Sequence, residues 1–224
     1  MFAAMGGAKS VTTVDMSNTY LDWAKKNVAL NKLSGPHAFI QADCTTWLGT
    51  HKGKYDLIFI DPPSFSNSKR MQNTWDVQRD HVKMLTDAKA CLKEQGTIIF
   101  SNNKRGFKLD ETAVTALGLQ VENITKETIP EDFARKSKIH QCWVLRFMKI
   151  YFYTGPQCSL CDLADIELAR TSRFSSLTIE KVNIRNSTEL YHLYGARIPV
   201  LKRDDNNKEI GWPFSAADLE EFLQ

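Results

Sequence analysis

The stretch YDLIFIDPP (residues 55–63) decides the fold of the first two thirds of this chain. Its run from Leu57 to Ile60 is apolar without alternation, which is typical of a strand buried on both faces of a parallel sheet. The two prolines end the strand because neither can donate to a sheet hydrogen bond. Asp61 therefore stands at the carboxyl end of a predicted strand, where α/β sheets bind ligands. The alternative interpretation of the same residues is a rigid loop that ends the strand and binds no ligand.

Predicted strands and helices alternate around this stretch. SVTTVD (10–15) and HAFIQAD (37–43) predict strands, and residues 18–33 between them have the apolar spacing of a helix. Residues 75–96 predict a second helix, capped by Gly96. Two further strands are predicted at residues 97–103 and 142–147. This order favours an α/β fold with a mostly parallel sheet covered on both faces.

Three acids follow three predicted strands: Asp15, Asp43 and Asp61. An acid at the end of the second strand of a nucleotide-binding sheet can accept hydrogen bonds from ribose hydroxyls. Aspartate is also a common turn residue, so for Asp15 and Asp43 the position alone leaves both interpretations open.

Four stretches carry a resemblance to a known family: DLIFIDPPSFSNSKRM (56–71), WDVQRDH (75–81), GTIIFSNNKRGF (96–107) and DFARKSKIHQCW (132–143). They look like the C-terminal methyltransferase of the bifunctional large-subunit ribosomal RNA methyltransferase K/L. The resemblance covers residues 1–147. It implies a Rossmann-like sheet that binds S-adenosylmethionine and methylates N7 of a guanine in 23S rRNA.

The resemblance also assigns roles to residues. It makes Asp15 the ribose-binding acid and Asp43 the adenine-edge residue. The implied cofactor contacts are Asp15, Met16, Asp43, Cys44 and Asp61. The implied catalytic loop is Asp61, Pro62, Pro63, Ser64 and Phe65. Separately from the resemblance, Lys69, Arg70, Lys104 and Arg105 are predicted to bind RNA because they are basic and follow strand ends.

The opening MFAAMGGAKS resembles the end of the helix that follows the glycine-bearing cofactor loop in this family. We therefore expect a truncated sheet that lacks its first strand and that loop. Its neighbouring strands would keep unpaired edges. The expected result is weak cofactor binding and weak methyl transfer. The alternative is a non-catalytic remnant, with activity only in the C-terminal domain.

Charge is distributed unevenly along the chain. Residues 1–149 contain 21 Lys and Arg against 15 Asp and Glu, whereas residues 150–224 contain 8 against 11. The basic excess fits either an RNA partner or scattered solvated lysines. The predicted loops contain the basic residues Lys69, Arg70, Lys104, Arg105, Arg135, Lys136 and Lys138. Near them in the sequence are aromatic residues that could stack on an extruded base: Phe65, Trp75, Phe107 and Phe133.

The residues after strand 97–101 discriminate between methylation chemistries. Methylation at C5 of a pyrimidine needs a cysteine nucleophile, which related enzymes place just after the corresponding strand. In this chain that position reads Ser101-Asn102-Asn103. A nucleophilic nitrogen such as guanine N7 needs only to be positioned in line. Cys44, Cys91 and Cys142 are interpreted as small core or strand residues.

MKIYFYTGPQCSLCDLA (148–164) begins a second predicted domain, of order βαβαββα. A helix is expected to open near Cys158, whose thiolate the helix N-terminus would stabilise. Cys158 is then the nucleophile and Cys161 the resolving thiol. The rival interpretation is half of a zinc site, but no second Cys or His pair has suitable spacing, so no metal is expected.

This segment resembles a small glutaredoxin-like family with a Cys-x-Leu-Cys-Asp signature. The resemblance implies a thioredoxin-like fold, a cis peptide before Pro199 next to the reactive sulfur, and a protein or glutathione disulfide as partner. GWPFSAAD (211–218) keeps only part of the family's glutathione-binding stretch, so glutathione is left open. A structural module without turnover is the alternative. Ser215 and Asp218 predict the cap of a last helix.

The domain boundary is predicted between Phe147 and Met148, without a linker. We expect two separately coherent domains, 1–147 and 148–224, in a fusion. No segment has the apolar length of a membrane span, and the N-terminus has no signal-peptide pattern, so a cytoplasmic protein without a membrane partner is expected.

Overall fold

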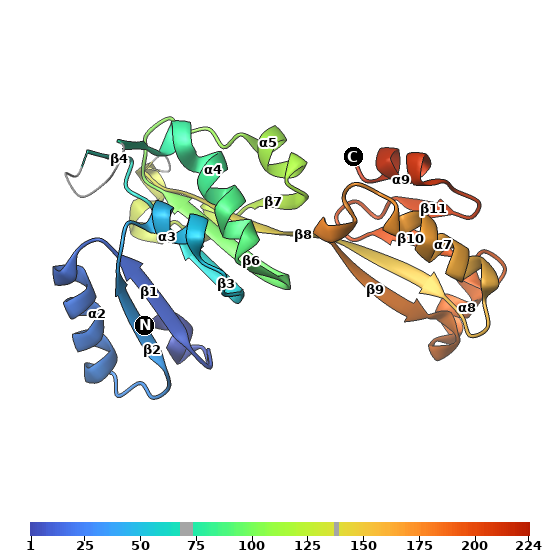
Figure 1. The fold of residues 1–224 in the computed structure, drawn as a ribbon, viewed down its shortest axis with the longest axis horizontal. Coiled ribbons are helices and arrows are strands. Elements are labelled where there is room, and N and C mark those ends of the chain that lie inside the picture. Colours follow the sequence, from blue (N-terminus) through green and yellow to red (C-terminus); the bar gives the residue numbers. More distant parts are fainter. Residues whose placement is uncertain (68–73, 137–138) are drawn as a thin grey trace. The chain divides into compact units, whose positions relative to one another are not determined.

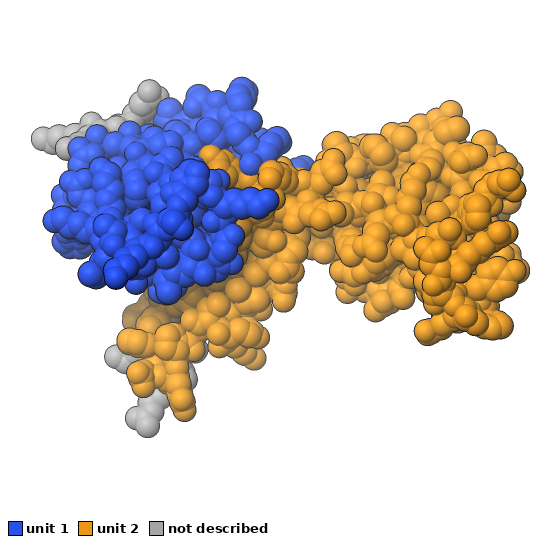
Figure 2. All heavy atoms as spheres, turned by 90° about the horizontal axis from the view of Figure 1, so that it is seen from below, with its two compact units in different colours: residues 1–54, 63–91 blue, residues 55–62, 92–224 orange. Residues whose placement is uncertain are grey.

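The computed structural model describes residues 1–67, 74–136 and 139–224, without the side chains of residues 134–136. The chain divides into two compact units (Figure 2). Unit 1 contains residues 1–54 and 63–91, and unit 2 contains residues 55–62 and 92–224. Each unit is described separately below.

Unit 1 is built on the parallel pair β1 (Val11–Asp15) and β2 (His37–Gln41), joined by helix α2 (Asn18–Leu30). Three side chains cap its helices: Ser17 caps α2, Asp43 caps α3 and Asp76 caps α4. The other elements of the unit are α1 (Phe2–Met5), α3 (Cys44–Thr50), β4 (Phe65–Ser66), β5 (Trp75–Asp76) and α4 (Val77–Ala90).

Unit 2 contains one mixed sheet, in which β3 (Tyr55–Ile60) runs parallel to β6 (Leu92–Asn102) and β6 runs antiparallel to β8 (Gln141–Thr154) (Figure 1). Strand β7 (Leu119–Asn123) also pairs antiparallel with β8. The prediction of a mostly parallel sheet is therefore wrong for this part. Helices α5 (Glu111–Ala116), α6 (Thr125–Thr128) and η1 (Glu131–Lys136) lie in the connections.

Strand β3 forms an edge of this sheet. Among the described residues β3 pairs only with β6 and β1 pairs only with β2, so the two parallel pairs belong to separate sheets. Unpaired strand edges were expected from the sequence. Leu57 and Phe59 are 48% and 64% exposed, and only Ile60 of β3 is buried. The prediction of burial on both faces is therefore wrong for β3.

Gly96 lies inside strand β6, so its prediction as the cap of a helix is wrong. Helix α4 ends at Ala90, with Cys91 as its C-cap. The register along β3 and β6 jumps from Tyr55 opposite Leu92 to Leu57 opposite Thr97. The extra residues of β6 form an irregularity next to Gly96, and glycine often marks such a site in a strand.

Strand β8 runs without a break through Phe147 and Met148. The sequence predicted one strand ending at Phe147 and another beginning at Lys149. The first part of β8 pairs with β6 and β7, and the second part pairs with β9 and β10. One backbone therefore serves both predicted domains, and the boundary at 147/148 stays a prediction.

The C-terminal part of unit 2 has the predicted order βαβαββα. It consists of the second part of β8, α7 (Ser159–Ala169), η2 (Phe174–Ser176), β9 (Leu177–Asn183), η3 (Ile184–Asn186), α8 (Thr188–Tyr194), β10 (Val200–Arg203), β11 (Glu209–Gly211) and α9 (Ala216–Phe222). Phe152, Leu168 and Leu219 are fully buried in its core. The predicted cap is confirmed: Ser215 and Asp218 form a capping box at α9.

Arg203 of strand β10 is hydrogen-bonded to the end of the C-terminal helix α9. Its guanidinium, only 6% exposed, donates to the carbonyl of Phe222 at 2.8 Å and to both carboxylate oxygens of Asp205 at 3.0 and 2.7 Å. We expect Arg203→Ala to lower the free energy of unfolding by about 2–3 kcal/mol, because it leaves a buried carbonyl and a carboxylate without their donor. Hydrogen exchange of peptides from residues 200–224 measures this locally.

Arg170→Ala is the matched control, since Arg170 makes an exposed ion pair with Glu167 and should contribute less than about 1 kcal/mol. The hydrogen bond from Arg203 lowers the pKa of Asp205. A lowered carboxyl pKa stabilises the fold above the unfolded pKa of about 3.9 and loses this contribution at lower pH. The effect of Arg203→Ala should therefore shrink below about pH 4. Equal losses in both variants would contradict the role of Arg203.

Among the residues that the structure describes, no helix has the length and apolar character needed to cross a membrane.

Candidate functional site

Unit 1 places two of the predicted acids at the same end of its parallel strands. Asp15 lies opposite Gln41, and Asp43 follows Gln41 by two residues. The Asp15 carboxylate accepts a hydrogen bond from the Ser17 amide at 2.6 Å through Oδ1. Its other oxygen has no hydrogen bond to any described residue. Asp15 can therefore hold the turn before α2 and still accept a hydrogen bond from a ligand.

Asp43 has a stronger structural role. Its Oδ1 accepts from the amide and the hydroxyl of Thr45, at 2.8 and 2.6 Å, and from the amide of Thr46 at 3.4 Å. The side chain is thus the N-cap of α3, which is the turn-forming role that the sequence left open. A ligand at Asp43 would contact the remaining carboxylate oxygen.

Cys44 and Met16 complete this end of the strand pair. The Cys44 thiol is half-buried and donates to the carbonyl of Val14 at 3.4 Å, and the Met16 carbonyl accepts from the side-chain amide of Gln41 at 3.3 Å. Burial and, to a smaller extent, the charges of Asp15 and Asp43 together raise the pKa of Cys44 from 9.0 to about 11. The predicted cofactor residues of unit 1 therefore lie together at the strand ends, where they present two carboxylates and a neutral thiol.

The raised pKa makes Cys44 a slow nucleophile. At pH 8 a thiol of pKa about 11 has about one thiolate per thousand molecules. We expect iodoacetamide to alkylate Cys44 at least about tenfold more slowly in the native chain than after denaturation, with a rate that still rises between about pH 10 and pH 11. Peptide mass mapping across a pH series measures this. An alkylation rate that levels off near pH 9 would contradict the raised pKa of Cys44.

Unit 2 places Asp61 directly after β3, at the carboxyl end of the strand. The Ser101 hydroxyl, buried at the matching end of β6, donates to Asp61 Oδ1 at 2.8 Å. Ser101 therefore orients the Asp61 carboxylate. Next to it, Asn102 is fully buried and accepts from the Lys104 amide at 3.1 Å.

Pro63, Ser64 and Phe65 belong to unit 1. The indole of Trp75 donates to the Pro63 carbonyl at 2.8 Å, and the Val77 amide donates to the Ser64 carbonyl at 3.2 Å. Phe65 pairs with Asp76 in the β4–β5 hairpin, while its ring is 57% exposed. The proline loop is therefore held from its backbone, and the aromatic ring is left accessible.

The prediction that four aromatic rings are available for stacking is wrong for two of them. Trp75 and Phe107 are each 5% exposed, because Trp75 supports the proline loop and Phe107 packs on Phe100 and Trp143. Phe65 and Phe133, 57% and 51% exposed, remain available for stacking. No local sequence pattern distinguishes the two buried rings from the two exposed ones, since Trp75 contacts the main chain twelve residues away.

The predicted basic residues are only partly described. Lys104 is half-buried and Arg105 is exposed, next to the end of β6. The predicted residues Lys69, Arg70 and Lys138, with the side chains of Arg135 and Lys136, lie outside the described part of the chain.

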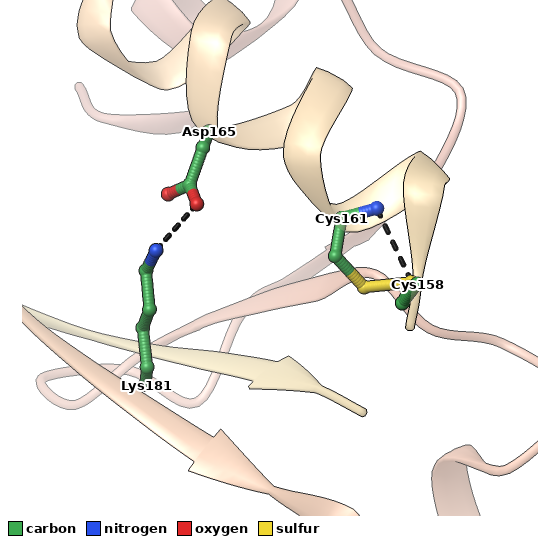
Figure 3. The surroundings of a disulfide bond; sticks show 4 residues. All are labelled: Cys158, Cys161, Asp165 and Lys181. Atoms are coloured by element: carbon green, nitrogen blue, oxygen red, sulfur yellow. Dashed lines mark hydrogen bonds and ion pairs between the residues drawn. A yellow bond between two sulfur atoms is a disulfide. The ribbon is translucent and has the colours of Figure 1, made fainter. Parts of the chain in front are cut away.

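The second site is the disulfide between Cys158 and Cys161, at the start of α7 (Figure 3). Cys158 is the N-cap of this helix, and its Sγ accepts from the Cys161 amide at 3.2 Å. Cys158 is half-buried, whereas Cys161 is 4% exposed. The expected cis peptide between Ile198 and Pro199 is present, and Ile198 and Cys158 pack against the same core cluster.

These features define two classes of fold. The N-terminal part of the chain has a Rossmann-like fold of the S-adenosylmethionine-dependent methyltransferase type, and a thioredoxin-like domain follows. The chain belongs to the family described as Conserved hypothetical protein 95, whose model matches residues 2–120. Residues 149–224 match the Glutaredoxin-like domain (DUF836).

Curated relatives agree with the resemblance seen in the sequence. The chain is 99% identical over 146 residues to the ribosomal RNA large subunit methyltransferase K/L of Alteromonas mediterranea, covering 65% of this chain and 21% of that protein. The protein of the same name from Pseudoalteromonas atlantica is 68% identical over 143 residues, which are 64% of this chain and 20% of that protein. The chain thus spans about a fifth of the length of these relatives.

Solved structures support the fold. A putative methyltransferase complexed with SAH is 24% identical, with a TM-score of 0.53, over 64% of this chain and 40% of that chain. A putative SAM-dependent methyltransferase from Streptococcus mutans gives a TM-score of 0.51 at the same identity and coverage.

Proposed function

We propose that residues 1–147 transfer a methyl group from S-adenosylmethionine to N7 of a guanine in 23S rRNA, and that residues 148–224 exchange thiols and disulfides. The observation that carries the first part is the near-identity of residues in this region to a large-subunit rRNA methyltransferase. The Cys158–Cys161 disulfide carries the second part.

The acids of unit 1 suit the adenosine part of the cofactor. Asp15 offers a carboxylate oxygen for ribose hydroxyls, and Asp43 offers one for the adenine edge. Met16 and the un-ionised Cys44 supply apolar surface beside them. S-adenosylmethionine, when bound, supplies the methyl group, and these side chains hold and orient it.

The loop from Asp61 to Phe65 suits the target base. The exposed ring of Phe65 can stack on an extruded guanine, and Arg105 can contact a phosphate. Guanine N7 already carries a lone pair, so the chain needs no general base and no nucleophile. Ser101 in place of a cysteine agrees with a nitrogen target.

Calorimetric titration of the full chain with S-adenosylhomocysteine tests the first part. Micromolar binding, together with labelled methyl transfer to a 23S rRNA fragment, would support it. Mapping the product to a nitrogen other than guanine N7 would overturn the position proposed here. Methyl transfer is expected to be weak, because β3 keeps one edge that no described strand pairs.

A second candidate function is dithiol exchange alone, with residues 1–147 as a non-catalytic platform. The edge of β3 that no described strand pairs favours it, because an open edge weakens the sheet that the cofactor site needs. Titration without detectable heat, combined with reduction of disulfides by the same sample, would select this candidate.

A further inference from the structure

Helix α7 exposes apolar side chains in addition to those on its buried face. Its buried face contains Cys161, Ala164 and Leu168. Three other apolar side chains are exposed: Leu160 at 44%, Leu163 at 48% and Ile166 at 49%. We call these three residues the α7 stripe. Exposed apolar side chains that gather on one helix are typical of a surface that another molecule covers.

The α7 stripe forms a continuous surface. Its members are three residues apart, and side chains at this spacing on a helix are neighbours, with Cβ atoms about 5–6 Å apart. Leu163 and Ile166 belong to α7, and neither packs in the core of this domain. The core therefore does not explain their apolar character.

The stripe begins at the disulfide. Leu160 lies between Cys158 and Cys161 in the chain, on the first turn of α7. Two cysteines joined by a disulfide have Cα atoms about 4.4–6.8 Å apart. A molecule attached to Cys158 as a mixed disulfide must therefore lie against the first turn of α7, where Leu160 is exposed.

The charges around the stripe indicate the chemistry of such a molecule. Asp162, on the same turn, is exposed, and its carboxylate forms no hydrogen bond or ion pair with the described residues. Asp165, one turn later, is neutralised by Lys181 of β9 (Figure 3). A partner that approaches Cys158 thus meets apolar side chains and one uncompensated negative charge. A basic residue complements that charge, whereas the carboxylates of glutathione are repelled by it.

We infer that the α7 stripe is the docking surface for polypeptide substrates of the Cys158–Cys161 pair, namely disulfide-bearing segments with apolar residues and a basic side chain next to the cysteine. This inference rests on the proposed thiol–disulfide exchange. It adds the substrate class and the surface that recognises it.

The exchange balances in two steps. The Cys158 thiolate attacks one sulfur of the substrate disulfide, which forms a mixed disulfide and releases the other substrate sulfur as a thiolate. The Cys161 thiolate then attacks Cys158, which forms the Cys158–Cys161 disulfide and releases the second substrate thiolate. Two electrons and the two thiol protons pass to the substrate. An external dithiol, such as dithiothreitol, reduces the pair again.

The test compares a peptide with a small molecule, using the full chain and dithiothreitol. One substrate is a disulfide-linked peptide with Leu and Lys beside its cysteine, and the other is hydroxyethyl disulfide, which has no side chains. We expect the double variant Leu163→Ser/Ile166→Ser to lower kcat/KM for the peptide about tenfold, because apolar burial is lost. Turnover of hydroxyethyl disulfide should change less than about twofold.

Two further variants sharpen the result. Leu193→Ser changes a residue of α8 that is equally exposed, at 53%, and should affect neither substrate. Asp162→Lys should favour a peptide with Glu in place of Lys beside the cysteine. Equal peptide turnover by the unmodified chain and the stripe variant, or faster reduction of glutathione disulfide than of the peptide, would overturn the docking inference. If the unmodified chain reduces none of these disulfides, the proposed exchange itself fails.

Discussion

Replacing Cys158 with serine is expected to abolish disulfide reduction by the C-terminal domain, with a loss in kcat/KM of at least about 1000-fold. The Cys158 sulfur caps α7 and accepts a hydrogen bond from the Cys161 amide, an arrangement that favours the thiolate. A serine hydroxyl at the same place does not ionise near neutral pH and cannot form a mixed disulfide. Reduction of hydroxyethyl disulfide with dithiothreitol measures the loss.

Cys161→Ser should behave differently, and this difference assigns the roles. Cys158 would still attack, but no second thiol would resolve the product, so the mixed disulfide should accumulate and appear in intact mass spectra under non-reducing conditions. Cys91→Ala, at a cysteine that is fully buried in unit 1, is the control and should react like the unmodified chain. A mixed disulfide trapped at Cys161 in the Cys158→Ser variant would reverse the assignment.

Replacing Asp15 with asparagine is expected to weaken S-adenosylhomocysteine binding by at least about tenfold, equivalent to about 1.4 kcal/mol. Asparagine keeps an oxygen that can accept from the Ser17 amide, so the turn before α2 should persist. The variant loses the charge that strengthens hydrogen bonds from ribose hydroxyls. Calorimetric titration of the two proteins, side by side, measures the change.

Asp22→Asn provides the matched control for this experiment. Asp22 is an exposed acid on α2 that pairs with Lys25, and its loss should change affinity less than about twofold. Equal losses in both variants would indicate a general effect of charge. Unchanged affinity in Asp15→Asn would show that the ribose is bound elsewhere.

The strand ends of the proposed methyltransferase site were predictable because they depend on local sequence. Strands β1, β2 and β3 all lie within the predicted ranges, and Asp15, Asp43 and Asp61 all stand at their carboxyl ends. In the same way, the Ser215 cap and the opening of α7 at Cys158 follow from side chains within four residues of the helix start.

Errors arose where distant residues decide the outcome. The helical spacing through Leu92 predicted a longer helix, but β3 pairs with the chain from Leu92 onward and converts it into strand. Trp75 and Phe107 look like free aromatic residues in the sequence, and both are buried by partners that are far away along the chain. Strand pairing and burial outweigh local preference, because they involve many more contacts.

The sequence by itself determined the alternation of strands and helices, the acids at the strand ends and the position of the dithiol pair, because apolar periodicity, prolines and helix caps act over a few residues. Only the tertiary structure decided that β8 is one continuous strand, that Ser101 orients Asp61, and that the apolar residues of the α7 stripe face outward. These features depend on which strands pair and on which helix face meets the core. Such contacts join residues that are remote in the chain, and no local pattern specifies them.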